Sequence, residues 1–103
     1  MFFEDSVKSM DVPQAKEMIS KGDVVIIDIR ASEAYHAGHV NGAVFVDRND
    51  CDEFIEQTEC SEKILCYCYK GVGSKSFCQK LKQLGFKNVY SLEGGFEAWK
   101  KHD

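Results

Sequence analysis

The stretch from Ile64 to Ser74 constrains the fold more than any other part of this 103-residue chain. An apolar run typical of a strand leads to Cys68, and a short loop with glycines at 71 and 73 follows it. Ser74 then begins a helical pattern of apolar residues that runs to Gly85. This order places Cys68 at the carboxyl end of a strand, facing the N-terminus of a helix.

Cys68 is the candidate nucleophile of this segment, which we call the 68–74 loop. Glycine permits left-handed backbone, so we expect at least one of Gly71 and Gly73 to have φ > 0 and the loop amides to form an anion-binding nest around the sulfur. The helix N-terminus adds partial positive charge. Both effects predict a lowered pKa and a reactive thiolate. The alternative is a small buried hydrophobe at a strand end.

Strands and helices alternate along the rest of the chain. The patterns predict helices over 12–21, 32–37, 50–57 and 74–84 and a last helix after Gly95, with strands over 24–27, 43–46, 64–68 and 88–90. The β-branched run at 24–27 is typical of a strand buried on both faces of a parallel sheet. We therefore predict one α/β domain over residues 1–103, with a mostly parallel sheet and helices on both faces.

The five cysteines do not indicate a disulfide framework, because their number is odd and no export signal is visible. Cys66 shares a strand face with Cys68, and Cys78 falls on the apolar helix stripe with Phe77, Leu81 and Leu84. Cys51 and Cys60 are interpreted as surface or partly buried thiols. No CxxC pair is present, so a metal site is not predicted.

Composition and charge limit the kinds of partner that we expect this chain to bind. The chain is 44% hydrophobic and 29% charged, as in ordinary globular proteins. No apolar run approaches the ~20 residues of a membrane span, so a cytoplasmic protein without a membrane partner is expected. Residues 1–60 carry a net charge of −8 and residues 61–103 one of +4. The positive half carries Cys68 and Lys70 and suits an anionic substrate, although solvated helix faces explain most of its lysines equally well. Overall acidity disfavours nucleic acid.

Three segments together resemble a single-domain rhodanese, a thiosulfate sulfurtransferase. The first runs from Val25 to Arg30 and continues with Glu33, Tyr35 and Gly38-His39-Val40-Asn41-Gly42-Ala43. It is similar to the family's Asp-x-Arg strand end and Gly-His-x-Pro-Gly-Ala loop. The second is the 68–74 loop, and the third, Leu92 to Trp99, resembles the Gly-Gly-x-x-x-Trp segment. In this order and spacing the three are specific.

Two departures from the family pattern matter. Asn41 stands where the family usually has proline, and the 68–74 loop lacks the arginine that many members carry near its end. The second departure leaves the source of substrate recognition open. Rhodanese-fold phosphatases have a loop one residue longer that ends in arginine, so the resemblance does not favour a phosphatase or an arsenate reductase.

The resemblance implies a three-layer rhodanese-like domain in which Cys68 forms a persulfide. It assigns anion binding to the backbone of Tyr69, Lys70, Gly71, Val72, Gly73 and Ser74. Asp28 and Arg30 correspond to the family's strand-end pair and are supporting residues, for which a structural ion pair is the favoured interpretation. His39 corresponds to a residue that fixes its loop.

The expected reaction moves sulfane sulfur from thiosulfate, or another small anionic donor, to cyanide or a thiol, without a cofactor. A protein sulfur acceptor is also allowed. Two alternatives stay open: an enzyme whose donor is another protein's persulfide, and a non-catalytic interaction module with the same fold. Modules of that kind commonly lack the loop cysteine, and Cys68 is present.

Overall fold

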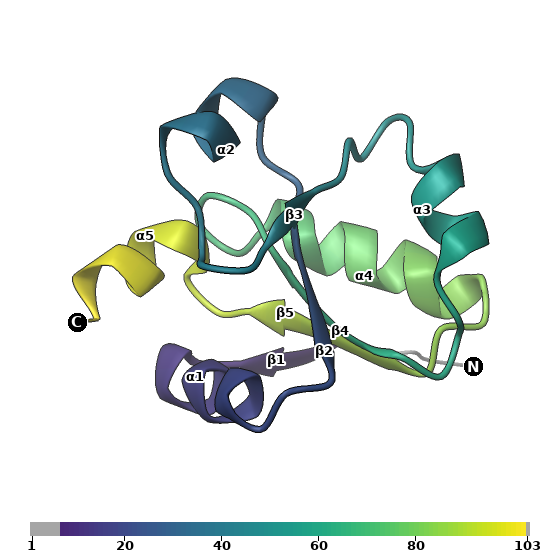
Figure 1. Cartoon of the computed structure of the whole chain (residues 1–103), viewed down its shortest axis with the longest axis horizontal. Coiled ribbons are helices and arrows are strands. Elements are labelled where there is room, and N and C mark those ends of the chain that lie inside the picture. Colours follow the sequence, from purple (N-terminus) through teal and green to yellow (C-terminus); the bar gives the residue numbers. More distant parts are fainter. Residues whose placement is uncertain (1–6, 103) are drawn as a thin grey trace.

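The computed structural model describes residues 7–102, which form a five-stranded sheet with helices on both faces (Figure 1). The strands are β1 (Lys8–Met10), β2 (Val24–Asp28), β3 (Val44–Phe45), β4 (Lys63–Tyr67) and β5 (Asn88–Leu92). The helices are α1 (Val12–Ser20), α2 (Ser32–Ala37), α3 (Asp52–Gln57), α4 (Gly73–Gln83) and α5 (Gly95–Lys101). The predicted α/β class with a parallel sheet is confirmed.

The sheet has the order β1-β5-β4-β2-β3, and every neighbouring pair of strands is parallel. β4 is the central strand, between β5 and β2. Asp28 at the end of β2 is paired with Tyr67 at the end of β4. The segments that follow these two strands therefore start side by side at the carboxyl edge of the sheet, where open α/β sheets place their binding sites.

Two apolar layers separate the helices from the sheet, because successive side chains of a strand point to opposite faces. Ile64 and Cys66 of β4 belong to the layer under α3 and α4, which also holds Phe77, Cys78, Leu81 and Phe54. Leu65 and Tyr67 belong to the opposite layer, with Val12, Ala15, Phe96 and Trp99 of α1 and α5. Figure 1 shows α1 on one side of the sheet and α4 on the other.

Helix α1 starts where its sequence predicts, because a capping box fixes its first turn. The Asp11 side chain accepts a hydrogen bond from the Gln14 amide (2.9 Å), and the Gln14 side chain accepts one from the Asp11 amide (3.0 Å). No helix within residues 7–102 has the length and apolar character needed to cross a membrane.

Four elements differ from the sequence prediction by two residues or more, among them β5, which runs to Leu92 instead of Tyr90. β1 is not predicted, because a three-residue edge strand that pairs only with β5 carries too little pattern. β3 spans two residues instead of four. α3 begins at Asp52 instead of Asp50, because the preceding residues form a turn in which Asp47 accepts hydrogen bonds from the Asn49 and Asp50 amides (2.9 and 3.0 Å).

Two side chains lie elsewhere than the sequence predicts. Leu84 is 50% exposed, because α4 ends one residue before it and the chain turns there. Cys51 is buried in the layer under α3 and α4, not on the surface, because it directly precedes α3 and packs against the sheet together with Val46 and Ile29.

Candidate active site

The Cys68 sulfur lies at the centre of a ring of donors from its own loop. The Gly71 amide donates a hydrogen bond to Sγ (3.1 Å), as does the Ser74 amide (3.3 Å), and the Ser74 hydroxyl is 3.5 Å from it. Gly71 has φ = +97°, as expected for at least one loop glycine. These amides form the nest predicted from the glycine spacing, and we call them the amide nest.

The amide nest sets the ionisation of Cys68, which is itself buried. Burial raises the pKa of the thiol, since it disfavours the charged form. Hydrogen bonds from the Ser74 hydroxyl and from the Ser74, Gly71 and Lys70 amides outweigh burial, so the pKa of Cys68 is lowered. Cys68 therefore carries more thiolate at neutral pH than an ordinary cysteine does.

The neighbouring thiol of Cys66 behaves in the opposite way. Burial and a hydrogen bond with Cys78 raise the pKa of Cys66 well above its usual value. Both cysteines lie in the same apolar layer, two residues apart. The difference comes from the loop amides, which only Cys68 contacts, so Cys66 stays a protonated core residue.

Ser74 is held in place by Ser91 of β5. Their hydroxyl oxygens are 2.7 Å apart, and both side chains are fully buried. Ser91 carries no signal in the sequence, since a serine inside a strand has many roles. Only the pairing of β5 with β4, in which Ser91 is opposite Cys66, brings it to the site.

The carbonyl side of the 68–74 loop is fixed by the start of α5. The Phe96 amide donates to the Cys68 carbonyl (2.8 Å) and the Glu97 amide donates to the Tyr69 carbonyl (3.1 Å). Gly95 permits this approach, because a Cβ there would lie 2.6 Å from both carbonyl oxygens. The third segment of the family resemblance therefore has a structural task, which is to turn the loop carbonyls away from the sulfur.

Asp28 and Arg30 form a buried ion pair beside the loop. Arg30 Nη2 donates to Asp28 Oδ2 (2.7 Å) and to the Gly38 carbonyl (2.6 Å). Burial lowers the pKa of Arg30, but the hydrogen bond and charge of Asp28 outweigh it and the pKa is raised. The Tyr67 hydroxyl donates to Asp28 (2.7 Å) and accepts from the Val40 amide (3.0 Å). This cluster ties β2 and β4 to the 38–42 loop.

His39 belongs to the same supporting structure. Its Nδ1 is 2.8 Å from the Tyr35 carbonyl oxygen, and its ring stacks on that of Tyr35 with a centroid distance of 3.9 Å. Neither contact reaches Cys68. Among residues 7–102, no group of three or more His, Cys, Asp or Glu side chains is placed to hold a metal ion.

Cys68 opens into a cavity of about 240 Å³, which we call the Cys68 cavity. It is lined by Arg48, Cys68, Tyr69, Lys70, Val72 and Gly73. The sequence predicts every lining residue except Arg48, which comes from the turn between β3 and α3. Nothing in the sequence near Arg48 links it to the loop, so only the fold reveals it.

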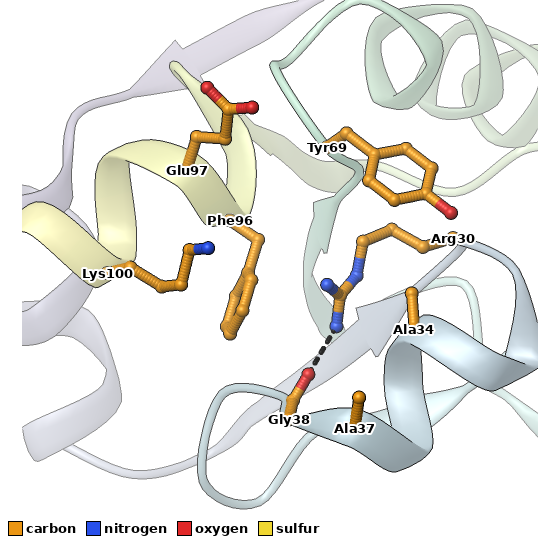
Figure 2. A pocket seen from close by; sticks show the side chains of 8 residues that line it. All are labelled: Arg30, Ala34, Ala37, Gly38, Tyr69, Phe96, Glu97 and Lys100. Atoms are coloured by element: carbon orange, nitrogen blue, oxygen red, sulfur yellow. Dashed lines mark hydrogen bonds between the residues drawn. The ribbon is translucent and has the colours of Figure 1, made fainter.

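A larger cavity of about 420 Å³ lies against the other side of Tyr69 and does not include Cys68. Figure 2 shows the Arg30 side chain between Tyr69 and Phe96, with its hydrogen bond to the Gly38 carbonyl. The Arg30 guanidinium lies 4.2 Å from the Phe96 ring centre. The charge of Arg30 in this cavity is already paired with Asp28.

The chain belongs to the rhodanese-like domain family, whose model matches residues 11–102. The thiosulfate sulfurtransferase GlpE of Coxiella burnetii is 40% identical over 89 residues, which cover 86% of this chain and 83% of that protein. GlpE of Pseudoalteromonas translucida is 37% identical over 92 residues, covering 89% and 88%. The predicted family is confirmed.

Solved structures agree on the fold. The rhodanese-like domain of the Anabaena protein Alr3790 superposes with a TM-score of 0.84 at 26% identity, over 95% of this chain and 75% of that one. The human single-domain sulfurtransferase TSTD1 has a TM-score of 0.83 at 17% identity, over 94% and 98%. At that identity the second likeness supports the fold alone.

Proposed function

We propose that this chain transfers sulfane sulfur from thiosulfate to cyanide or a thiol through a persulfide on Cys68. The predicted enzyme class, thiosulfate sulfurtransferase, is confirmed by the family and by the named activity of relatives 37–40% identical to the chain. The observation that supports the persulfide is the convergence of the Gly71 and Ser74 amides on the Cys68 sulfur.

The first half-reaction is a displacement at sulfur. The Cys68 thiolate attacks the outer sulfur of thiosulfate, a new S–S bond forms, and the original S–S bond breaks with its electron pair leaving on sulfite. Cys68 becomes a persulfide anion, so the total charge is unchanged. The amide nest faces negative charge before and after this step, because the charge only moves from Sγ to the added sulfur.

The second half-reaction regenerates the enzyme. Cyanide, or the thiolate of an acceptor, attacks the terminal sulfur of the persulfide, and the S–S bond breaks with its electron pair returning to Cys68 as thiolate. The products are thiocyanate or an acceptor persulfide. Both substrates reach the sulfur through the Cys68 cavity, whose rim includes the exposed Tyr69 and Val72.

The two alternatives differ from this proposal in whether Cys68 receives sulfur, and from which donor. A persulfide relay uses a protein donor instead of thiosulfate, and an interaction module does not load Cys68 at all. The lowered pKa of Cys68 favours an enzyme over a module, since a docking surface needs no thiolate. A cytoplasmic location and the absence of a nucleic-acid partner stay predictions.

Intact-mass measurement after incubation with thiosulfate tests the proposal. Wild type should gain the mass of one sulfur atom, and cyanide should remove it as thiocyanate. Cys68→Ser should gain nothing, whereas Cys66→Ser should behave as wild type, because Cys66 is a protonated core residue. A gain only with a protein persulfide would support the relay, and no gain from either donor would support the module.

A further inference from the structure

The Cys68 cavity contains a guanidinium that is not part of the 68–74 loop. Arg48 reaches the cavity from the turn between β3 and α3 and lies against Gly73, the first residue of α4. A Cβ built on Gly73 would lie 2.5 Å from Arg48 Nη1 and 3.4 Å from its Cζ. The guanidinium therefore occupies the space that a side chain at position 73 would fill.

The charge of Arg48 is available to a ligand. Within residues 7–102 the ion pairs are Lys21 with Glu17 and Arg30 with Asp28, and Arg48 is in neither. The adjacent Asp47 carboxylate accepts a hydrogen bond from the Asn49 amide instead. The positive charge of Arg48 also acts on the neighbouring Cys66 thiol, whose pKa it lowers against the larger effect of burial.

A guanidinium at this place suits the substrate chemistry. The reacting end of thiosulfate is its outer sulfur, and its other end is a sulfonate with three oxygens. Arginine binds such oxyanions with two parallel N–H donors, which a lysine ammonium cannot do. The loop itself offers only Lys70 as a formal charge, and it lacks the arginine that many rhodanese relatives carry near its end.

We propose that Arg48 binds the sulfonate of the donor and makes the site selective for dianionic sulfur donors, so that a residue outside the loop supplies the missing arginine. This inference rests on the proposed function of Cys68. The amide nest holds the sulfur that reacts, and Arg48 holds the group that leaves as sulfite. Arg48 is thus a binding residue for the donor half-reaction and has no part in cyanide attack on the persulfide.

Steady-state kinetics of Arg48→Gln test the assignment. The KM for thiosulfate should rise about tenfold, the loss expected for one charge-assisted pair, with little change in kcat. The KM for cyanide should not change. The rise should shrink with added salt, because the screening length is ~10 Å at 0.1 M. Lys87→Gln removes the same charge from an exposed residue just before β5, at the opposite end of the sheet, and should leave both KM values unchanged.

A second donor separates recognition of the dianion from general attraction. Methanethiosulfonate is a monoanion with two oxygens, whereas thiosulfate is a dianion with three. It releases methanesulfinate when the thiolate takes its outer sulfur. Arg48→Gln should raise the KM for this donor by much less than the KM for thiosulfate. Equal increases for both donors would overturn the proposed selectivity.

Gly73→Ala moves Arg48 without removing it. The φ of Gly73 is not positive, so alanine is tolerated by the backbone, but its Cβ would displace the flexible guanidinium. The substitution should raise the KM for thiosulfate in the wild-type background and add little in the Arg48→Gln background. Additive effects would show that Arg48 does not act from its place beside Gly73.

The outcomes keep the two proposals apart. If wild type forms no persulfide from thiosulfate, the proposed function fails whatever Arg48 does. If wild type forms the persulfide and Arg48→Gln has an unchanged KM at low salt, only the Arg48 assignment fails. If Arg48→Gln reaches the wild-type extent of persulfide at saturating thiosulfate, the variant is folded and its defect lies in donor binding.

Discussion

Two neighbouring strands of the sheet, β2 and β4, end in polar segments with different roles. At the end of β2, Asp28 and Arg30 neutralise each other, and Tyr67 and the Gly38 carbonyl take up further hydrogen bonds. At the end of β4, Cys68 receives donors from the loop backbone, and within residues 7–102 no side chain of opposite charge forms a hydrogen bond with it. The charges at the β2 end are paired with each other, whereas the donors at the β4 end are available to a ligand.

The difference shows what makes a strand end reactive in this fold. Formal charges placed side by side cancel, and the pair then serves to hold elements together. Backbone amides carry only partial charges, but they cannot be neutralised by a neighbouring side chain once the 68–74 loop and α5 fix their direction. At these two strand ends the paired charges of Asp28 and Arg30 are therefore structural, and hydrogen bonds from the 68–74 loop activate the thiol.

The largest expected effect comes from removing the ion pair at the end of β2. Asp28→Ala leaves Arg30 buried and unpaired and should lower the free energy of unfolding by about 3–5 kcal/mol. The activity per folded molecule should change little, because neither residue contacts the Cys68 sulfur. Urea denaturation and kcat at low temperature measure the two quantities.

The exposed pair of Glu17 and Lys21, with N and O atoms 3.7 Å apart, provides the control. Glu17→Ala should change the free energy of unfolding by less than about 1 kcal/mol, as exposed pairs do. If Asp28→Ala abolished sulfur transfer in a fully folded protein, Asp28 would belong to the active site and the contrast between the strand ends would be lost.

The next largest effect comes from distorting the backbone of the 68–74 loop at the end of β4. Gly71→Val places a β-branched residue at φ = +97° and its Cβ 3.0 Å from the Gly94 amide nitrogen. The loop should shift, an amide should leave the sulfur, and kcat/KM should fall about a hundredfold, as when one oxyanion donor is removed. Steady-state kinetics and the rate of iodoacetamide alkylation at neutral pH measure the loss.

Gly22 matches Gly71 in conformation but not in place. It has φ = +80°, and, its own atoms and those of its two chain neighbours apart, no heavy atom of residues 7–102 lies within 4 Å of the point that a Cβ would occupy there. Gly22→Val should therefore carry a similar backbone strain at the end of α1 and leave kcat/KM unchanged. Equal activity losses in both variants would mean that strain alone, and not the position of the loop amides, causes the effect.

The smallest expected effect comes from removing one hydrogen-bond donor to the Cys68 sulfur. Ser74→Ala removes the hydroxyl beside the sulfur, whose hydrogen bond helps to lower the pKa of Cys68, so the variant should have a higher Cys68 pKa than wild type. The lowered pKa stabilises the fold above the unfolded pKa of ~8.5, and this contribution is lost as pH falls through the folded pKa. Wild type and variant should therefore differ most in stability at high pH.

The pH dependence of Cys68 alkylation measures the shift. The wild-type midpoint should lie below ~8.5, and the Ser74→Ala midpoint should lie above the wild-type one. Ser91→Ala keeps the Ser74 donor but frees its orientation, so it should move the midpoint less. An identical midpoint in all three proteins would show that the hydroxyl does not stabilise the thiolate.

The sequence locates Cys68 and its nest because every signal involved is local. A strand, a cysteine, two glycines and a helix start lie within a few residues, and their order fixes their geometry. Arg48 and Ser91 cannot be found in this way, since one comes from a turn without periodicity and the other depends on the register of β5 against β4.

The wrong predictions about the fold have the same origin. β1 consists of three residues whose place is decided by pairing with β5, and Cys51 is buried because of where α3 packs. Leu84 matches the helical period, but the helix has already ended there. Periodicity predicts which face a residue occupies inside an element, and it does not predict where the element stops.

The hydrogen bonds between α5 and the 68–74 loop make the amides of Phe96 and Glu97 reporters of that loop. Any local opening that frees the Cys68 and Tyr69 carbonyls must also expose these two amides to exchange with solvent deuterium. Their exchange rates thus follow the order of the loop without a probe on the thiol. Substrate that rigidifies the loop would slow exchange at the far end of the sequence, in a helix that forms no part of the Cys68 cavity.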